Sequence, residues 1–149
     1  MNISEHETMA DAVQAMQAEF LDNFGLKLSA AAAREKVIDR IPLEKTIQAD
    51  ILKKLRQIGD SCVAWKANSG TYASMNGVPD ITCIYRGKFV GIEVKRPLLG
   101  KVSELQQRMA DKIDKAGGVY VIATCWRDVE AVLANVDTWM ISDFERRER

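Results

Sequence analysis

The stretch PDITCIYRGKFVGIEVK, residues 79–95, decides how this chain folds. Its two halves are rich in β-branched and aromatic residues, which favour strands. They are separated by Arg86 and Gly87, and a loop of two residues is common in β-hairpins. With this loop Tyr85 pairs with Lys88, and the pairing of all other residues in the two strands follows. The stretch therefore predicts an antiparallel hairpin with a fixed register.

This register would bring charged side chains together on one face of the hairpin. Counting back from the turn places Asp80 opposite Glu93, and opposed residues have Cβ atoms about 5 Å apart, so their like charges repel. Lys95 lies two positions after Glu93, and its side chain projects on the same face because strand side chains alternate. The intervening apolar side chains, Val90, Ile92 and Val94, would point into a core. A loop of odd length would send Asp80 to the opposite face, so the cluster depends on the register.

The flanking sequence predicts an αβββαβα order of elements around the hairpin. We expect helices at residues 43–58, 103–116 and 128–136 and strands at residues 62–67, 81–85, 89–95 and 119–124. The first helix begins after Pro42 and ends at Gly59, and the second begins with a capping box, Ser103 to Gln106. A Ser-, Gly- and Asn-rich loop, residues 68–79, joins the first two strands. The fold class is therefore α/β, with a mixed central sheet flanked by helices.

The chain has 149 residues, of which 47% are hydrophobic, enough for one compact core. The domains expected are a helical N-terminal arm at residues 1–41, a core at residues 42–136 and a charged tail at residues 137–149. In the arm, two helical stretches are separated by Gly25, and the first carries apolar residues at helical spacing: Met9, Val13, Met16 and Phe20. This stripe needs a cover, which either its own domain or a second copy of the chain could supply.

Charge and composition narrow the functional classes. The 21 basic and 21 acidic residues balance, but residues 1–40 are acidic overall, whereas residues 86–115 hold eight basic and four acidic residues. Phosphate could be bound there, although solvated helix faces often carry as many lysines. Three cysteines without metal-site spacing suggest reduced core residues. Neither a signal peptide nor a membrane span is evident, so we expect a cytoplasmic protein without membrane contact.

A third acidic residue favours a metal site over a simple ion pair. A lysine beside two acids is most often a salt bridge. Glu44, however, lies three residues before Ile47, on or beside the sheet-facing stripe of its helix. Three carboxylates suit a hard cation, Mg²⁺, for which Mn²⁺ should substitute. The single histidine, His6, argues against zinc and against a catalytic triad. No organic cofactor is expected.

At this point the sequence resembles a known family of nucleases. Pro79-Asp80 followed by Glu93-Val94-Lys95, within this order of elements, resembles the PD-(D/E)xK nuclease superfamily. The finer similarity is to its VRR-NUC branch, whose stand-alone members are phage and bacterial nucleases. It runs in order from Glu44 and Gln48 through Asn68-Ser69-Gly70 and Gly77-Val78-Pro79-Asp80 to Ser103-Glu104-Leu105-Gln106. The resemblance covers residues 43–133 and implies a restriction-endonuclease-like αβββαβ core.

The resemblance also implies a role for each matching residue. Asp80, Glu93 and the main-chain carbonyl of Val94 would bind the metal, and Glu44 would hold it directly or through a water molecule. Lys95 would orient or activate the attacking water. Gln106 matches a position near the site, but it also fits the capping box, so its role stays open between the two.

The substrate implied by the resemblance is branched DNA, such as a Holliday junction, in a bacterial cell or the cytoplasm of a phage-infected host. Contacts to DNA are expected from Lys66, Asn68, Tyr72, Arg86, Lys88, Arg96 and Lys101, although surface lysines usually just face water. A junction needs two cuts, so a homodimer is expected, with the arm as its contact. The alternatives are a sequence- or mismatch-type nuclease of the same fold and a catalytically silent DNA-binding module, which intact Asp80, Glu93 and Lys95 disfavour.

Overall fold

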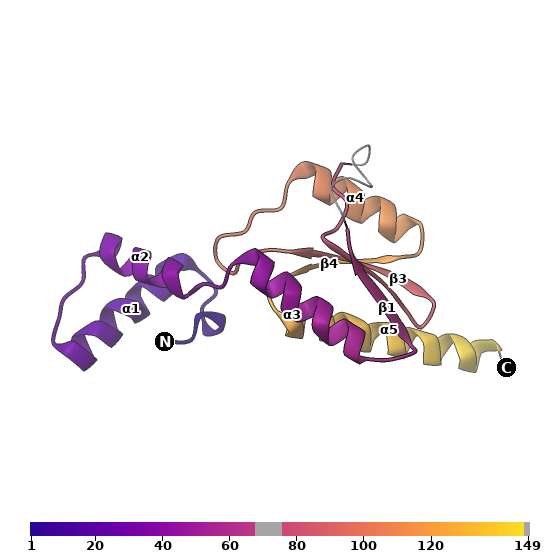
Figure 1. The fold of residues 1–149 in the computed structure, drawn as a ribbon, viewed down its shortest axis with the longest axis horizontal. Helices are drawn as coiled ribbons and strands as arrows, with labels where there is room; N and C mark the ends of the chain where they lie inside the picture. The colour runs from indigo at the N-terminus through magenta and orange to yellow at the C-terminus, as the bar shows by residue number, and fades with distance from the viewer. Residues whose placement is uncertain (68–75, 148–149) are drawn as a thin grey trace. The chain divides into compact units, whose positions relative to one another are not determined.

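A computed structural model describes residues 1–67 and 76–147 of the chain. Two compact units are formed, and their helices and strands are labelled in Figure 1. The helical unit comprises Met1–Leu43 and Arg96–Gly100, and the sheet unit comprises Glu44–Lys95 and Lys101–Arg149. No helix in the described part of the chain is both long and apolar enough to cross a membrane.

The helical unit contains a short 3₁₀ turn, η1 (Ile3–Glu5), and two helices, α1 (Met9–Phe24) and α2 (Ala30–Arg40). The side chains of Thr8 and Ser29 cap the two helices by accepting hydrogen bonds from main-chain N–H groups three residues later. Helix α1 ends at Gly25, which adopts the left-handed conformation. The buried core of this unit consists of Ile3, Ala12, Met16, Ala33, Val37 and Ile41.

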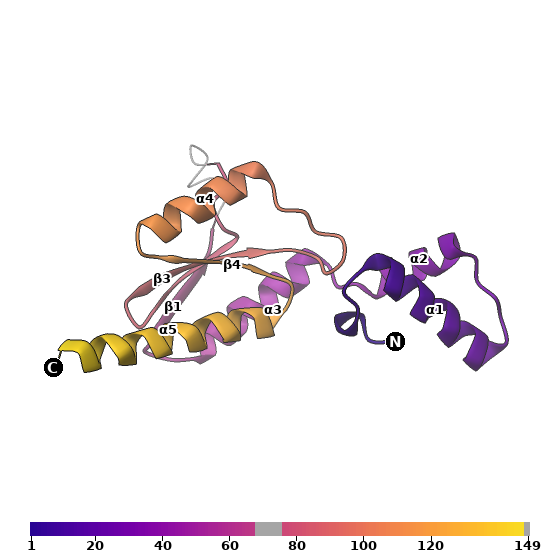
Figure 2. The same ribbon diagram turned by 180° about the vertical axis from the view of Figure 1, so that it is seen from behind.

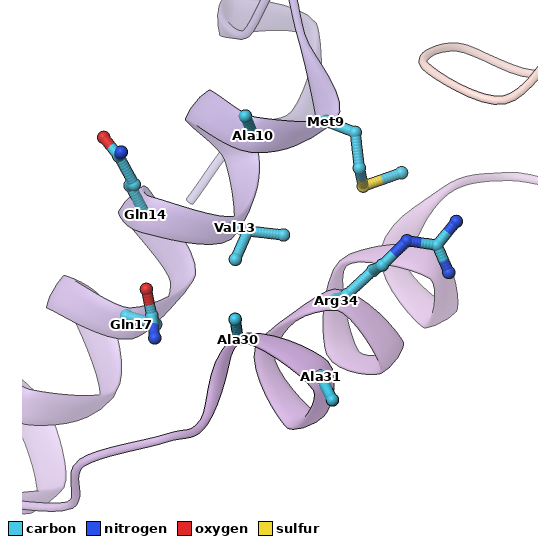
Figure 3. Close-up of a pocket in the computed structure, with 8 residues that line it drawn as sticks. All are labelled: Met9, Ala10, Val13, Gln14, Gln17, Ala30, Ala31 and Arg34. Carbon is cyan, nitrogen blue, oxygen red and sulfur yellow. The ribbon is translucent and has the colours of Figure 1, made fainter.

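The apolar stripe of α1 is covered within the helical unit, which is the first of the two covers considered from the sequence. Met16 is fully buried, and Met9, Val13 and Phe20 pack against the same core. Met9 and Val13 also border an open groove of about 560 Å³ between α1 and α2 (Figure 3). Its lining residues are Met9, Ala10, Val13, Gln14, Gln17, Ala30, Ala31 and Arg34. Part of the stripe therefore remains next to an apolar surface groove.

The sheet unit is built on four strands in the order β1-β2-β3-β4. Their bounds are Cys62–Lys66 for β1, Ile81–Tyr85 for β2, Lys88–Val94 for β3 and Val119–Ala123 for β4. The first three strands are antiparallel, and β4 is parallel to β3, so the sheet is mixed as predicted. Tyr85 pairs with Lys88, which confirms the predicted register. Arg86 and Gly87 both have positive φ angles, 49° and 80°, as a tight hairpin turn of this kind requires.

Helices cover both faces of this sheet. Helices α3 (Glu44–Gln57) and α5 (Trp126–Arg147) lie on one face, and α4 (Glu104–Lys115) lies on the other (Figures 1 and 2). The main core lies between the sheet and α3 and α5, and its fully buried side chains are Ile51, Leu55, Ile81, Cys83, Val90, Ile92, Val94, Ala123 and Val129. The three residues predicted to face a core, Val90, Ile92 and Val94, are among them.

Helix α5 is longer than the sequence predicted. The prediction ended the helix at Val136, the last residue of its apolar stripe, and treated residues 137–149 as a charged tail. The helix instead starts at Trp126 and continues to Arg147. Neither glycine nor proline occurs between Val136 and Arg147, so no residue there interrupts the helix.

The loop that leads into β2 passes close to the backbone of α4. Gly77, in this loop, has a φ of 78°, and a Cβ atom on it would lie 2.4 Å from the carbonyl oxygen of Leu105. Gly87 in the hairpin turn has nearly the same φ, 80°, but a Cβ atom there would meet no atom within 4 Å. Both glycines therefore adopt a positive φ angle that other residues rarely adopt. Of the two, only Gly77 also lacks the space for a side chain.

We expect Gly77→Ala to destabilise the protein more than Gly87→Ala. Both variants place a side chain at positive φ, which costs about 1–2 kcal/mol. Gly77→Ala must also displace the Leu105 carbonyl, a further overpacking cost of about 1–3 kcal/mol. Urea unfolding of both variants measures the difference. Equal losses would show that the loop does not lie against α4.

Candidate active site

Asp80 lies at the entrance to β2, where the hairpin register places it opposite Glu93. The neighbouring pair, Ile81 and Ile92, is part of the β2–β3 ladder. Asp80 extends this pairing through its side chain, because its Oδ2 accepts a hydrogen bond of 2.8 Å from the N–H of Val94. This bond ties the carboxylate to the end of β3. Half-buried Asp80 is thus held beside the carboxyl-terminal end of that strand.

Glu93 is the most deeply buried charged residue described, with 3% of its surface exposed. Two donors from different elements reach the same carboxylate oxygen, Oε1. Lys95 donates from Nζ at 2.8 Å, and Gln106 of α4 donates from Nε2. A buried carboxylate without partners would be very costly, so these two donors are what allow Glu93 to lie here.

Gln106 has both of the roles that the sequence left as alternatives. Its Oε1 accepts a hydrogen bond of 2.9 Å from the N–H of Ser103, and its own N–H donates to Ser103 Oγ at 3.2 Å, which completes the capping box of α4. Its Nε2 is then directed to Glu93. The start of α4 therefore fixes an amide donor on the carboxylate.

The electrostatics of the site are dominated by negative charge. Burial raises the pKa of Glu93, and the charges of Asp80 and Glu44 raise it further, while Lys95 opposes this rise. Glu44 lies in the first turn of α3 and is half-buried. Two carboxylates thus act on Glu93 beside one ammonium group, so the surroundings of Glu93 carry an excess of negative charge that a cation would offset.

The donor set fits a hard divalent cation that keeps part of its water shell. Within residues 1–67 and 76–147, no three side chains among His, Cys, Asp and Glu form a metal-ligand cluster on their own. Two carboxylates, those of Asp80 and Glu93, lie on neighbouring strand ends, and Mg²⁺ is commonly bound through one or two carboxylates together with waters. The oxygen-only chemistry of these side chains suits Mg²⁺ or Mn²⁺ and not zinc.

Tyr120 is a site residue that the sequence argument missed. It pairs with Gly91 across the parallel β3–β4 ladder, two residues before the Glu93 pair, and so lies on the same face as Glu93. Its hydroxyl is buried and has no hydrogen-bond partner among the described residues. Burial raises the pKa of Tyr120, and the charges of Glu93 and Asp80 raise it further, which places the phenol beside both carboxylates.

Several of the predicted DNA contacts lie away from this site. Asn68 and Tyr72 are outside the described residues. Lys66 pairs with Ile81, whose side chain is in the α3 core, so Lys66 lies on the sheet face opposite Glu93. Its side chain is therefore on the other side of the sheet from the carboxylates, because side chains alternate along β1.

Arg86 and Lys88 lie at the hairpin turn, at the other end of β3 from Glu93. Glu93 lies five positions after Lys88 along the strand, which corresponds to about 17 Å. Arg86 forms an ion pair of 2.9 Å with Asp137, and Lys88 lies over the ring of Trp139. The length of β3 therefore separates these two residues from the carboxylates. Lys101 is exposed.

Arg96 is engaged by the main chain of the helical unit. Its guanidinium donates hydrogen bonds to the carbonyl oxygens of Ile38, Ile41 and Pro42 at 3.4, 2.9 and 3.2 Å. These carbonyls lie at and just after the end of α2, where helix carbonyls lack partners within the helix. The sequence suggested a phosphate contact for Arg96, and in the structure its Nε and Nη2 atoms donate to these carbonyls.

No protein-family model matches the sequence, and none of the curated proteins is similar to it. Among solved structures, one described as "VRR_NUC domain" is similar, with a TM-score of 0.51 and 22% sequence identity. The similarity covers 61% of this chain and 94% of that chain. At this level of identity the likeness is one of fold. The protein therefore has the restriction-endonuclease-like α/β fold that its sequence predicted, and it shares this fold with a VRR_NUC domain.

Proposed function

We propose that this protein is a divalent-metal-dependent endodeoxyribonuclease that hydrolyses phosphodiester bonds. The observation that carries the proposal is the buried carboxylate of Glu93, held by Lys95 and Gln106 and placed beside Asp80. A fold needs no such arrangement for stability, because apolar side chains of similar volume are often as stabilising as a buried ion pair. The fold shared with a VRR_NUC domain supports the same conclusion.

Asp80, Glu93 and the main-chain carbonyl of Val94 would hold Mg²⁺, or Mn²⁺ in its place, with Glu44 contributing directly or through a water molecule. The bound cation would supply Lewis acidity, which polarises the phosphate and lowers the pKa of water. The protein itself fixes the carboxylates. Asp80 is held by the N–H of Val94, and Glu93 is held by Gln106.

Lys95 would orient the attacking water and stabilise negative charge on the phosphoryl oxygens. Its side chain is 15% exposed and its ammonium is held by Glu93 at 2.8 Å, so it has a defined position beside the carboxylates. Preorganised positive groups of this kind act on charge that develops in the transition state. Gln106 is a positioning residue, since it acts through Glu93.

The proposed substrate is branched DNA, such as a Holliday junction. This finer proposal rests on the resemblance of the sequence to stand-alone VRR-NUC nucleases. Cleavage of linear duplex at defined sequences or at mismatches, and binding without cleavage, are the alternatives that a substrate panel separates. Labelled linear, flap, fork and four-way-junction DNAs would be incubated with the protein in Mg²⁺, in Mn²⁺ and in EDTA.

We expect Lys95→Ala to lower kcat on the preferred DNA by about 100-fold or more, because loss of one preorganised group that stabilises charge in the transition state costs about that factor. DNA binding, measured by fluorescence anisotropy, should stay close to wild type. Lys112→Ala, which removes an exposed lysine in the last turn of α4, is the matched control and should cleave normally. Cleavage by Lys95→Ala at the wild-type rate would rule out the proposed site.

Two copies of the chain are proposed to pair through the helical unit, so that one particle makes both cuts in a junction. The support is the apolar groove between α1 and α2, whose lining includes Met9, Val13 and Ala31. An open apolar groove between two helices can accept a helix from a second copy.

Ala31→Glu tests the pairing surface, because Ala31 is exposed on the groove and a glutamate there should not disturb the core. We expect the wild-type chain to sediment as a dimer and to cut opposing strands of a junction, and Ala31→Glu to sediment as a monomer that only nicks. Ala131→Glu, an exposed position on α5, should remain dimeric. A dimeric Ala31→Glu that still makes paired cuts would place the interface elsewhere.

A further inference from the structure

Two residues of the candidate site lie where the chain passes between its two units. The first segment of the helical unit ends at Leu43, and Glu44 follows directly. The second segment begins at Arg96, and Lys95 precedes it directly. Glu44 and Lys95 are therefore each joined by one peptide bond to the helical unit. Their positions therefore depend on how the chain is held at two junctions, Leu43–Glu44 and Lys95–Arg96.

A single side chain, that of Arg96, links these two junctions. The guanidinium of Arg96, the residue after Lys95, donates to the carbonyl oxygens of Ile41 and Pro42, which precede Glu44 by three and two residues. A third bond, of 3.4 Å, reaches the carbonyl of Ile38 in α2. A cation is favourable here because helix carbonyls carry partial negative charge at the carboxyl-terminal end.

The backbone around Arg96 is also fixed, so the guanidinium is not on a loose segment. The N–H groups of Leu99 and Gly100 both donate to the carbonyl of Arg96, at 3.3 and 2.9 Å. Leu98 and Leu99 pack against the core of the helical unit. On the other side, the N–H of Lys95 donates to the carbonyl of Ala123 in β4 at 2.9 Å. Lys95 thus lies between two anchored segments.

We propose that Arg96 is a positioning residue for the metal site, which fixes Glu44 relative to Lys95 and Glu93. This inference rests on the proposed function. Helix α3, which begins at Glu44, packs against β3, the strand that carries Glu93. Without the guanidinium, the segment before Glu44 would be released from the segment after Lys95. A displacement of about 1 Å at a reacting centre can lower the rate about 100-fold.

A purely structural role for Arg96 in the helical unit is the competing explanation. Arg40 provides the matched control, because it also belongs to the end of α2 and makes strong ionic bonds within the helical unit, to Glu19 at 2.8 and 2.7 Å. Among the described residues, Arg40 makes no hydrogen bond to the carbonyls that precede Glu44. Loss of either arginine removes one positive charge and weakens the helical unit. Only loss of Arg96 also removes the bonds to the carbonyls of Ile41 and Pro42, which precede Glu44.

The experiment compares Arg96→Gln, Arg96→Lys and Arg40→Gln in the full chain, each with and without Glu44→Gln. Three quantities are measured: the Mn²⁺ dissociation constant by calorimetry, kcat and KM on DNA, and the melting temperature in EDTA. We expect Arg96→Gln to weaken Mn²⁺ binding about 5-fold or more and to lower kcat about 100-fold with little change in KM. Arg40→Gln should lower only the melting temperature. Arg96→Lys, which keeps a cation, should recover part of the loss and covers the case in which Arg96→Gln fails to fold.

The combination with Glu44→Gln distinguishes positioning from general weakening. If Arg96 acts by placing Glu44, its loss should add little once Glu44 is neutral, and this non-additivity measures the coupling between the two residues. Full additivity, or equal effects of Arg96→Gln and Arg40→Gln on Mn²⁺ binding, would overturn the inference. Mn²⁺ binding without DNA cleavage by the wild-type chain would overturn the proposed function alone, since the Mn²⁺ titrations of the variants still test Arg96.

Discussion

The pairing register of β2 with β3 is the constraint on which the rest of the site depends. The turn of Arg86 and Gly87 sets this register, because both residues adopt positive φ angles that close the hairpin with two residues. Side chains alternate along a strand, so a shift of one residue would move Asp80 into the core face and Ile81 into the site. One local turn thus decides which residues face α4 and which face α3.

Burial of the Glu93 carboxylate lowers the free energy of unfolding, and the rest of the sheet unit must offset this loss of stability. Glu93 is almost fully buried, and burial with neighbouring carboxylates disfavours its charged form. Lys95 and Gln106 offset this cost only in part, and the hydroxyl of Tyr120 is buried without a partner among the described residues. The core on the α3 and α5 face is formed mainly by apolar side chains, such as Ile51, Leu55 and Val129. Most of the apolar core therefore lies on one face of the sheet, and Glu93 and Gln106 of the proposed site lie on the other.

The sequence was sufficient for the features that depend on local pattern. The hairpin register, the capping box at Ser103 and the mixed sheet follow from spacing and turn chemistry, and they are found as predicted. It was not sufficient where segments distant in the chain meet. The parallel register that brings Tyr120 beside Glu93 depends on how β4 returns across α4, and the docking of Arg96 on the end of α2 joins residues more than fifty positions apart. No local spacing encodes either contact.

The central claim is that Asp80 and Glu93 together bind a divalent cation. The most direct measurement is an anomalous difference map from crystals of the full chain soaked in Mn²⁺. The account predicts a peak in contact with the carboxylates of both Asp80 and Glu93, on the sheet face that carries Gln106. It would be contradicted by a map with Mn²⁺ bound at other positions, or with none, while Glu93 remains hydrogen-bonded to Lys95.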